Sequence, residues 1–346
     1  MNNKAFSFLD ISDTMQAMSL SIGIVGLPNV GKSTLFNALT KKSVPAENYP
    51  FCTIDPSVGI VPVPDDRLWK LSEFSKSEKT IPAAIEFVDI AGLVAGASKG
   101  EGLGNKFLTN IREVDAIAHV VRTFQDPGVI HVANKVSPLD DIGVINLELI
   151  LADMEVVSKR IGTLAKDVKK GDKLAIAEEA LLKRIEAALE AGQLASTIGV
   201  SEEEKFMIKS LNLLTLKPML YVLNTSEANE NVEFEVPGAF VKIDSVFEKG
   251  FDDLITAAYE LLGLETFFTT GADETRAWTI KKGSTAPIAG TAIHTDFKDK
   301  FIRAEVVYWS DLLEAGSYAD ARAKGKVRTE GKEYIVKDGD VIEFKI

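Results

Sequence analysis

An eight-residue segment near the amino terminus combines glycine, lysine and serine in an order that suits phosphate binding. Gly26 to Ser33 reads Gly-Leu-Pro-Asn-Val-Gly-Lys-Ser, between a short β-branched run and a helical stretch. The glycines let backbone N–H groups converge on phosphate oxygens, and the start of a helix adds its positive dipole end. Lys32 places a cation on the β and γ phosphates, and Ser33 can ligate Mg²⁺. Contacts to the nucleotide are expected from Asn29, Val30, Gly31, Lys32, Ser33 and Thr34.

Two further segments could complete a magnesium site. Asp89-Ile90-Ala91-Gly92 closes a predicted strand and fits the D-x-x-G loop that senses the γ-phosphate, so Asp89 would hold Mg²⁺ through water. Thr53 lies between this loop and the phosphate segment, which favours it as the second hydroxyl ligand over an ordinary turn residue. The predicted metal ligands are therefore Ser33, Thr53 and Asp89.

The base site separates adenine from guanine. GTPases use Asn-Lys-x-Asp after a strand, and the aspartate accepts two hydrogen bonds from guanine. The corresponding segment here is Asn224-Thr225-Ser226-Glu227, which has no lysine to pack on the base and an acid one carbon longer. A carboxylate also repels the acceptor at adenine N1, so we assign adenine recognition to Asn224 and to the neighbouring backbone at Thr225. Because a lost hydrogen-bond pattern can discriminate by ~10⁴, ATP is favoured over GTP.

The residue that usually orients the attacking water is missing. In Ras-type enzymes a glutamine follows D-x-x-G, whereas this chain has Leu93, and an apolar side chain cannot position water. Turnover without a partner is expected near the intrinsic Ras rate, on the order of 10⁻⁴ to 10⁻³ s⁻¹. Asn29 stands where potassium-activated P-loop enzymes hold a monovalent cation, so K⁺ is a candidate cofactor beside Mg²⁺.

The elements that carry these residues alternate between strand and helix. Short apolar runs predict buried strands at 21–25, 85–90, 116–121 and 219–223, with helical stretches at 33–40 and 104–113 between them. This alternation is typical of a doubly wound α/β domain.

A helical pattern interrupts the alternation from Pro138 to Lys217. Apolar residues recur every three or four positions, and a break at Lys169-Lys170-Gly171-Asp172 separates two such runs. We expect an antiparallel coiled-coil hairpin; two ordinary amphipathic helices packed on the core are the alternative. The seam residues are Leu147, Ile150, Met154, Val157, Ile161, Leu164, Val168, Leu174, Ala177, Leu181, Ile185 and Ala188.

The last part of the chain changes to short strands separated by turns, at 276–280, 303–307, 334–336 and 341–346, which predicts a small β-grasp domain. The predicted division is a tail at 1–17, the first part of the P-loop domain at 18–138, a helical coiled-coil insertion at 139–216, the second part of the P-loop domain at 217–265 and the β-grasp domain at 266–346. Met18 is a candidate for the natural start.

Composition excludes several classes of protein. A chain of 346 residues with 46% apolar residues can bury the cores of two or three domains. No run approaches the roughly 18 apolar residues that span a bilayer, and no secretion signal precedes the first strand, so a soluble, cytoplasmic protein is expected. One cysteine excludes an intramolecular disulfide, and three histidines argue against a Cys/His zinc site. The net charge of −12 argues against coating nucleic acid through bulk electrostatics but leaves a local basic surface open.

Taken together, the motifs resemble those of the YchF, or Obg-like, ATPases. The likeness rests on Gly26–Ser33, on Asn-Tyr-Pro-Phe-Cys-Thr at 48–53, on the stretch from Asp89 to Asn105 and on Asn-x-x-Glu at 224–227. It continues through Arg276-Ala277-Trp278-Thr279-Ile280, Ile293-His294-Thr295-Asp296-Phe297 and Val336-Lys337-Asp338-Gly339-Asp340, and so covers nearly all of residues 18–346.

The resemblance implies a G domain interrupted by a coiled-coil arm, a C-terminal TGS domain, preference for ATP and binding to ribosomes. Lys32 of the phosphate loop is a predicted catalytic residue. The resemblance implies that His119 is catalytic as well, because it matches a histidine proposed in the family as the substitute for the missing glutamine. A histidine within an apolar strand is otherwise a hydrogen-bonded core residue. Residues 228–250 are short for the family, so the loop near 242–245 that completes the base pocket does not align.

The leading hypothesis is a monomeric, Mg²⁺-dependent ATPase that acts as a nucleotide switch on the ribosome, meeting the large subunit or the whole particle, with RNA contacts through the TGS domain. The alternatives are a GTPase of the same fold and a non-enzymatic ribosome or RNA adaptor. Steady phosphate release that Lys32→Ala abolishes distinguishes either enzyme from the adaptor.

Overall fold

The computed structural model describes residues 20–41, 57–90, 103–124, 136–226 and 234–346. The chain forms two compact units. The first, which we call the nucleotide unit, contains residues 21–41 and 87–261. The second, the C-terminal unit, contains the described residues 20, 57–86 and 262–346.

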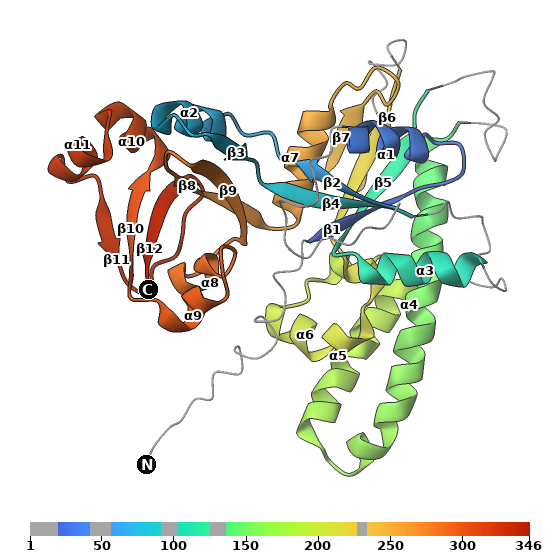
Figure 1. Cartoon of the computed structure of the whole chain (residues 1–346). Helices are drawn as coiled ribbons and strands as arrows, with labels where there is room; N and C mark the ends of the chain where they lie inside the picture. The colour runs from blue at the N-terminus through green and yellow to red at the C-terminus, as the bar shows by residue number, and fades with distance from the viewer. Residues whose placement is uncertain (1–19, 42–56, 91–102, 125–135, 227–233) are drawn as a thin grey trace, which may run out of the picture. The chain divides into compact units, whose positions relative to one another are not determined.

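A parallel sheet forms the centre of the nucleotide unit (Figure 1). It contains β1 (Ser21–Val25), β5 (Ala116–Arg122), β6 (Met219–Asn224) and β7 (Phe240–Ile243) in that spatial order, and β4 (Ala84–Asp89) lies on the other side of β1. Parallel pairing places Val25 opposite His119 and His119 opposite Tyr221. The helices around it are α1 (Lys32–Lys41), α3 (Leu103–Glu113) and α7 (Phe251–Leu261). The predicted doubly wound α/β fold is confirmed, and every predicted strand and helix of this part forms within two residues of its expected ends.

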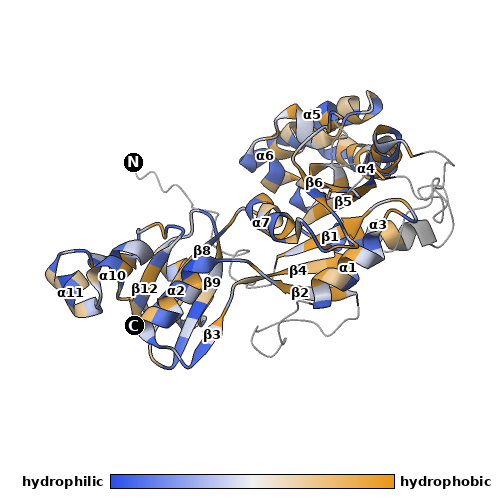
Figure 2. Ribbon diagram, turned by 90° about the horizontal axis from the view of Figure 1, so that it is seen from above, coloured by the Kyte–Doolittle hydropathy of each residue, from blue (hydrophilic) through white to orange (hydrophobic). Residues whose placement is uncertain are grey.

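Strands β1 and β5 are almost entirely buried, as a parallel sheet covered on both faces requires. Figure 2 shows the hydrophobic residues concentrated along β1 and β4, whereas the helices alternate between hydrophobic and hydrophilic residues. The carboxyl ends of these strands meet at one edge of the sheet, where ligands bind in open α/β folds.

The helical insertion is a long hairpin, which we call the arm. It consists of α4 (Pro138–Lys169) and α5 (Lys173–Glu190), followed by α6 (Glu202–Met207) and short 3₁₀ turns at Ala195–Ile198, Lys209–Leu211 and Leu214–Leu216. The predicted reversal is confirmed: Gly171 has φ +79°, and Asp172 Oδ1 accepts hydrogen bonds from the N–H groups of Leu174 and Ala175. At 1.5 Å per residue, the 32 residues of α4 extend about 48 Å.

Most of the predicted seam is buried between α4 and α5, including Val157, Leu164, Leu181 and Ile185. Leu147, Leu174 and Ala177 were assigned to it wrongly, since all three are exposed, Leu147 by 52% and Leu174 by 76%. The helices differ in length, 32 residues against 18, so Leu147 in the first third of α4 lacks a facing turn of α5. Leu174 lies in the first turn of α5, where the chain is still reversing.

The C-terminal unit has a six-stranded sheet in the order β11-β10-β12-β8-β9-β3. Its strands are β3 (Lys79–Ile81), β8 (Leu264–Thr270), β9 (Glu274–Lys281), β10 (Arg303–Tyr308), β11 (Arg328–Glu330) and β12 (Asp340–Lys345). The helices are α2 (Asp66–Ser75), α8 (Ala286–Gly290), α9 (Asp296–Lys300), α10 (Trp309–Ala315) and α11 (Tyr318–Ala323). The remaining strand, β2 (Val58–Pro62), is the neighbour of β4 in the other six-stranded sheet.

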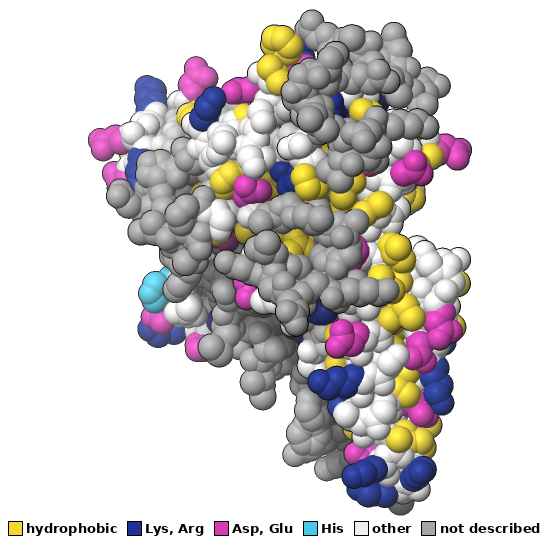
Figure 3. Space-filling model, turned by 90° about the vertical axis from the view of Figure 1, so that its right-hand side faces the viewer, with side chains coloured by type: hydrophobic (Ala, Val, Ile, Leu, Met, Phe, Trp, Pro, Cys, Tyr) yellow, Lys and Arg dark blue, Asp and Glu magenta, His cyan; other side chains and the backbone are white. Residues whose placement is uncertain are grey.

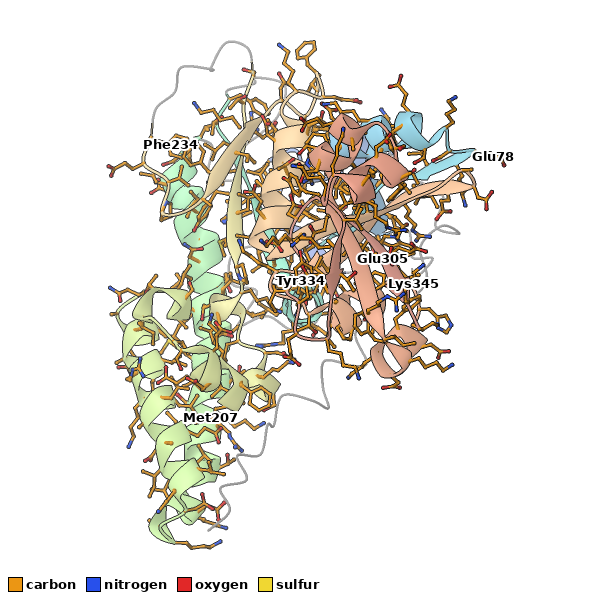
Figure 4. All side chains as sticks on the ribbon, turned by 90° about the vertical axis from the view of Figure 1, so that its left-hand side faces the viewer. Glu78, Met207, Phe234, Glu305, Tyr334 and Lys345 are labelled. Carbon is orange, nitrogen blue, oxygen red and sulfur yellow. The ribbon has the colours of Figure 1, made fainter. Side chains whose placement is uncertain are left out.

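Three of the four strands predicted here form, but 334–336 does not. Ile335 makes only an isolated bridge with Thr285. The hydroxyl of Tyr334, labelled in Figure 4, donates to Asp340 Oδ2 at 2.7 Å. The same carboxylate accepts from the Lys337 N–H at 2.9 Å, so residues 334–340 form a turn closed by the buried Asp340. Strands β8 and β11 were not predicted.

Residues 66–81 join the C-terminal strands, whereas the sequence division grouped them with the P-loop domain. Strand β3 pairs in parallel with β9, placing Thr80 opposite Thr275. Arg67 of α2 donates to Asp338 at 2.5 Å. Contacts between residues nearly 200 or more positions apart leave no trace in local periodicity, which is why the predicted boundaries could not include them.

Candidate functional site

The segment from Gly26 to Gly31 forms a tight loop between β1 and α1. A Cβ atom on Gly26 would lie 2.5 Å from the Val120 carbonyl oxygen, so only glycine lets the loop approach β5 this closely. Gly31 has φ +96°, and a Cβ there would lie 2.3 Å from Asn224 Nδ2. The Leu35 N–H donates to Gly31 O at 2.9 Å, which begins the α1 hydrogen-bond ladder. Both glycines of the predicted phosphate loop are therefore required by its geometry.

Side chains from the ends of β5 and β6 hold this loop from behind. Asn224 Nδ2 donates to Val30 O at 2.9 Å, and Asn224 Oδ1 accepts from the Ser245 N–H at 3.2 Å. Arg122 Nη1 donates to Asn29 O at 3.5 Å, a long bond from a guanidinium that is 1% exposed. The two side chains are neighbours in register across β5 and β6. Asn224 thus joins the phosphate loop to the turn after β7.

Arg122 was missed by the sequence reasoning, and Ser245 was named only as part of the loop at 242–245. The signal for Arg122 was an arginine ending an otherwise apolar strand, and such a residue is seldom buried without a specific partner. Ser245 acts through its backbone N–H, which carries no sequence signal. Thr225, predicted at the base site, uses Oγ1 to donate to Ile243 O at 3.0 Å.

Lys32 lies at the centre of the loop. Its Nζ donates to Leu27 O at 2.7 Å, and the residue is 8% exposed. Burial lowers the pKa of Lys32 to about 8, while the negative charge of Asp89 opposes that shift. Burial likewise raises the pKa of Asp89, and Lys32 opposes it. The two groups, one from α1 and one from the end of β4, are close enough to act on each other's charge, as the predicted phosphate and metal roles require.

Three of the residues predicted to face the ligand are accessible. Asn29, Ser33 and Thr34 are exposed, and Asn29 has φ +62°, a left-handed conformation that asparagine tolerates well. Thr53 lies outside the described residues, as does Leu93. The described part of the chain contains no cluster of three or more His, Cys, Asp or Glu that could hold a metal. A P-loop magnesium needs no such cluster, because hydroxyl, carboxylate, water and phosphate oxygens suit this hard cation, and Ser33 with Asp89 fits that donor set.

His119 lies inside the sheet, on β5, and is 1% exposed. Its Nδ1 has no hydrogen-bond partner among the described residues, and its ring centroid lies 5.5 Å from that of Tyr221. Burial, and secondarily the charge of Lys32, lowers the pKa of His119 to about 3. The ring is therefore neutral at physiological pH.

A parallel sheet, a glycine-bounded loop leading into a helix, a lysine at the start of that helix and an aspartate at the end of a neighbouring strand together define a P-loop nucleoside triphosphatase. Residues 21–155 match the family described as "50S ribosome-binding GTPase", and residues 264–346 match the YchF GTPase C-terminal family, described as "Protein of unknown function".

Similarity to known proteins extends over almost the whole chain. A Bacillus subtilis protein named "Ribosome-binding ATPase YchF" is 53% identical over 95% of this chain and 99% of its own length. The Escherichia coli O157:H7 protein of the same name is 47% identical over 94% and 99%. The "Structure of the Schizosaccharomyces pombe YchF GTPase" aligns with a TM-score of 0.83 at 37% identity, over 94% of this chain and 98% of that one. The chain belongs to the YchF family.

No helix in the described residues is long and apolar enough to cross a membrane.

Proposed function

We propose that this chain is an Mg²⁺-dependent ATPase that hydrolyses ATP to ADP and phosphate and uses this cycle as a switch on the ribosome. The observation that carries the proposal is the phosphate loop itself, held by Asn224 and Arg122 with Lys32 at its centre. Its YchF relatives in B. subtilis and E. coli are named as ribosome-binding ATPases, which supports both halves of the proposal. We also propose that it works as a cytoplasmic monomer and that RNA contacts involve the C-terminal unit.

The residues act in distinct ways. Backbone N–H groups of Asn29 to Thr34 bind the phosphates, and Lys32 exchanges its bond to Leu27 O for the β and γ oxygens. Ser33, Thr53 and Asp89 would hold Mg²⁺, which supplies charge neutralisation at the transferred phosphoryl group when bound. An ammonium group already buried beside one carboxylate gains a stronger partner in the triphosphate, so Lys32 favours the loaded state.

Hydrolysis needs a group that orients water, and Leu93 cannot supply it. His119 is the candidate within the chain. Its neutral ring, whose Nδ1 has no partner among the described residues, suits a hydrogen bond to water, although the ring is 1% exposed in this structure. Asn29, which is exposed, would hold K⁺, and this ion would supply a further positive charge at the phosphates.

The base preference follows from Asn224-Thr225-Ser226-Glu227, which lacks the lysine and aspartate of guanine recognition. A GTPase is the second candidate, favoured by the family match described as a GTPase and by the description of the S. pombe relative. Competition between ATP and GTP for the purified chain decides between them, and tighter binding of GTP would favour the second.

The function is tested by phosphate release and by co-sedimentation with ribosomes in ATP, in ADP and without nucleotide. We expect slow, steady release from ATP that Lys32→Ala abolishes, and ribosome binding that differs between ATP and ADP. Release that persists in Lys32→Ala would contradict the assigned site. Binding that is identical in all three conditions would contradict the switch.

A further inference from the structure

The far end of the arm is basic, although the chain as a whole is acidic. Residues 166–173 contain four lysines against two aspartates, a net charge of +2, so the rest of the chain carries −12 − 2 = −14. All six charged residues are exposed. Figure 3 shows Lys and Arg side chains gathered at this end of the arm. We call this surface the arm tip and define it by Lys166, Lys169, Lys170 and Lys173.

Both aspartates at the tip are engaged within the chain. Asp172 caps α5 through its bonds from Leu174 and Ala175, and Asp167 Oδ1 pairs with Lys170 Nζ at 2.8 Å. Lys166, Lys169 and Lys173 form no ion pair with any residue that the structure describes. Three ammonium groups are therefore available to an anion from outside.

Helix stability explains only part of this charge. Lys166 and Lys169 lie in the last turn of α4, where cations interact favourably with the helix dipole. Lys173 is the first residue of α5, where a cation is unfavourable for the same reason. Lys173 therefore adds to the positive surface without stabilising its own helix.

The arm is suited to carry this surface to a distant partner. A continuous core of buried side chains from both helices, including Val157, Leu164, Leu182 and Ile185, stiffens the hairpin. The tip stands at the end of a helix about 48 Å long, which begins beside the sheet of the nucleotide unit (Figure 1).

We propose that the arm tip binds the phosphate backbone of ribosomal RNA. The inference rests on the ribosome binding proposed above and identifies the surface that performs it. Lysines are point charges on flexible stems, which suit sequence-independent contacts to phosphates rather than the reading of bases. Such contacts displace counterions, so affinity must fall steeply with salt.

The test compares two triple variants with the same change in charge. The tip variant is Lys166→Gln/Lys169→Gln/Lys173→Gln, and the control is Lys183→Gln/Lys205→Gln/Lys209→Gln, which alters exposed lysines elsewhere on the helical insertion. Co-sedimentation with purified ribosomes is measured from 50 to 300 mM KCl, and binding to protein-free ribosomal RNA is measured in parallel. None of the six lysines contacts the phosphate loop, so circular dichroism and ATP turnover should match the parent.

We expect the tip variant to bind ribosomes at least about tenfold more weakly at low salt. The slope of log affinity against log salt should also become shallower by about 2, because each lost phosphate contact contributes roughly 0.7 to 0.9. The control should keep the parent slope. Equal slopes and affinities for the tip variant and the control would overturn the inference, as would weaker ribosome binding with an unchanged slope and unchanged RNA binding, which would indicate a protein partner. A parent chain that binds no ribosomes in any nucleotide state would instead refute the proposed function.

Discussion

At the residue scale, Asn224, which the sequence assigns to adenine recognition, also has a bonding role within the chain. The motif predicts a contact with adenine. In the structure, the side-chain amide of Asn224 bridges Val30 O and the Ser245 N–H, and the residue is 1% exposed. We infer that it is a positioning residue, which recognises the base only through the loop and turn that it joins.

Replacing Asn224 by alanine tests this role. The change leaves the Val30 carbonyl and the Ser245 N–H without their partner at a cost of roughly 1–3 kcal/mol. We therefore expect affinity for ATP and for GTP to fall together, by about 5- to 150-fold, in calorimetric titrations. A selective loss of ATP affinity would show direct contact with the base. Thr225→Val is the matched control, because it removes a neighbouring hydrogen bond without touching the phosphate loop.

The buried His119 leads to a pH dependence of stability. Its pKa falls from 6.5 in the unfolded chain to about 3 in the folded one, so the unfolded chain binds the extra proton between these values. The stability contributed by the neutral ring is thus complete above pH 6.5 and is lost as pH falls toward 3, at up to about 1.4 kcal/mol per pH unit.

His119→Gln should therefore lose less stability than the parent between pH 7 and pH 5 in urea unfolding. His294→Gln removes a histidine that is 65% exposed and should keep the parent's acid sensitivity. If both variants follow the parent curve, His119 does not titrate as its burial requires.

At the scale of elements, the arm could be predicted well because its signal is local. Apolar spacing identified both helices and the break between them, but it could not show that Asp153 is buried in the middle of α4. This carboxylate accepts from the N–H of Leu214 at 3.0 Å and from the N–H and hydroxyl of Thr215, both at 2.7 Å. Arg112 of α3 lies 3.8 Å away. From the sequence alone, an aspartate among apolar residues is expected to face solvent. Only the fold shows that Asp153 joins α3, α4 and the segment leading to β6.

Asp153→Ala should be among the most destabilising single changes in the nucleotide unit. It leaves buried donors without an acceptor and the Arg112 guanidinium without its counter-charge, a loss of about 3–5 kcal/mol. The urea midpoint should fall accordingly, whereas Glu155→Ala, on the exposed side of the same helix, should change stability by less than about 0.5 kcal/mol. Similar midpoints for the two variants would show that the junction is not strongly coupled to folding.

For the whole molecule, the sequence predicted the fold class but not the assignment of all segments to its units. The strands β9, β10 and β12 were found from their own patterns, while α2 and β3 carry no local mark of their partners. Their contacts are extensive: Ser77 Oγ donates to Gly271 O at 2.6 Å, and the N–H of Glu78, labelled in Figure 4, donates to Ala272 O at 2.8 Å. Leu68 and Leu71 of α2 are buried. Residues 66–81 are therefore part of the folded C-terminal unit and not merely a link to it.

This assignment predicts that a fragment of residues 262–346 is incomplete. Without β3 the edge of β9 is unpaired, and without α2 the Phe268 ring loses the Arg67 guanidinium 5.3 Å from its centroid. We expect the fragment to unfold at a lower urea concentration than a fusion that joins 57–86 to it through a flexible linker. A peptide of residues 57–86 added in trans should restore dispersed amide resonances to the fragment. The same peptide carrying Arg67→Ala and Thr80→Pro should not restore them, because it lacks the ion pair with Asp338 and one backbone donor of β3. The isolated fragment could instead unfold cooperatively at the same urea midpoint as the fusion. Residues 57–86 would then contribute nothing to the stability of this unit, and the division predicted from local sequence patterns would describe the folding of the chain better than the contacts do.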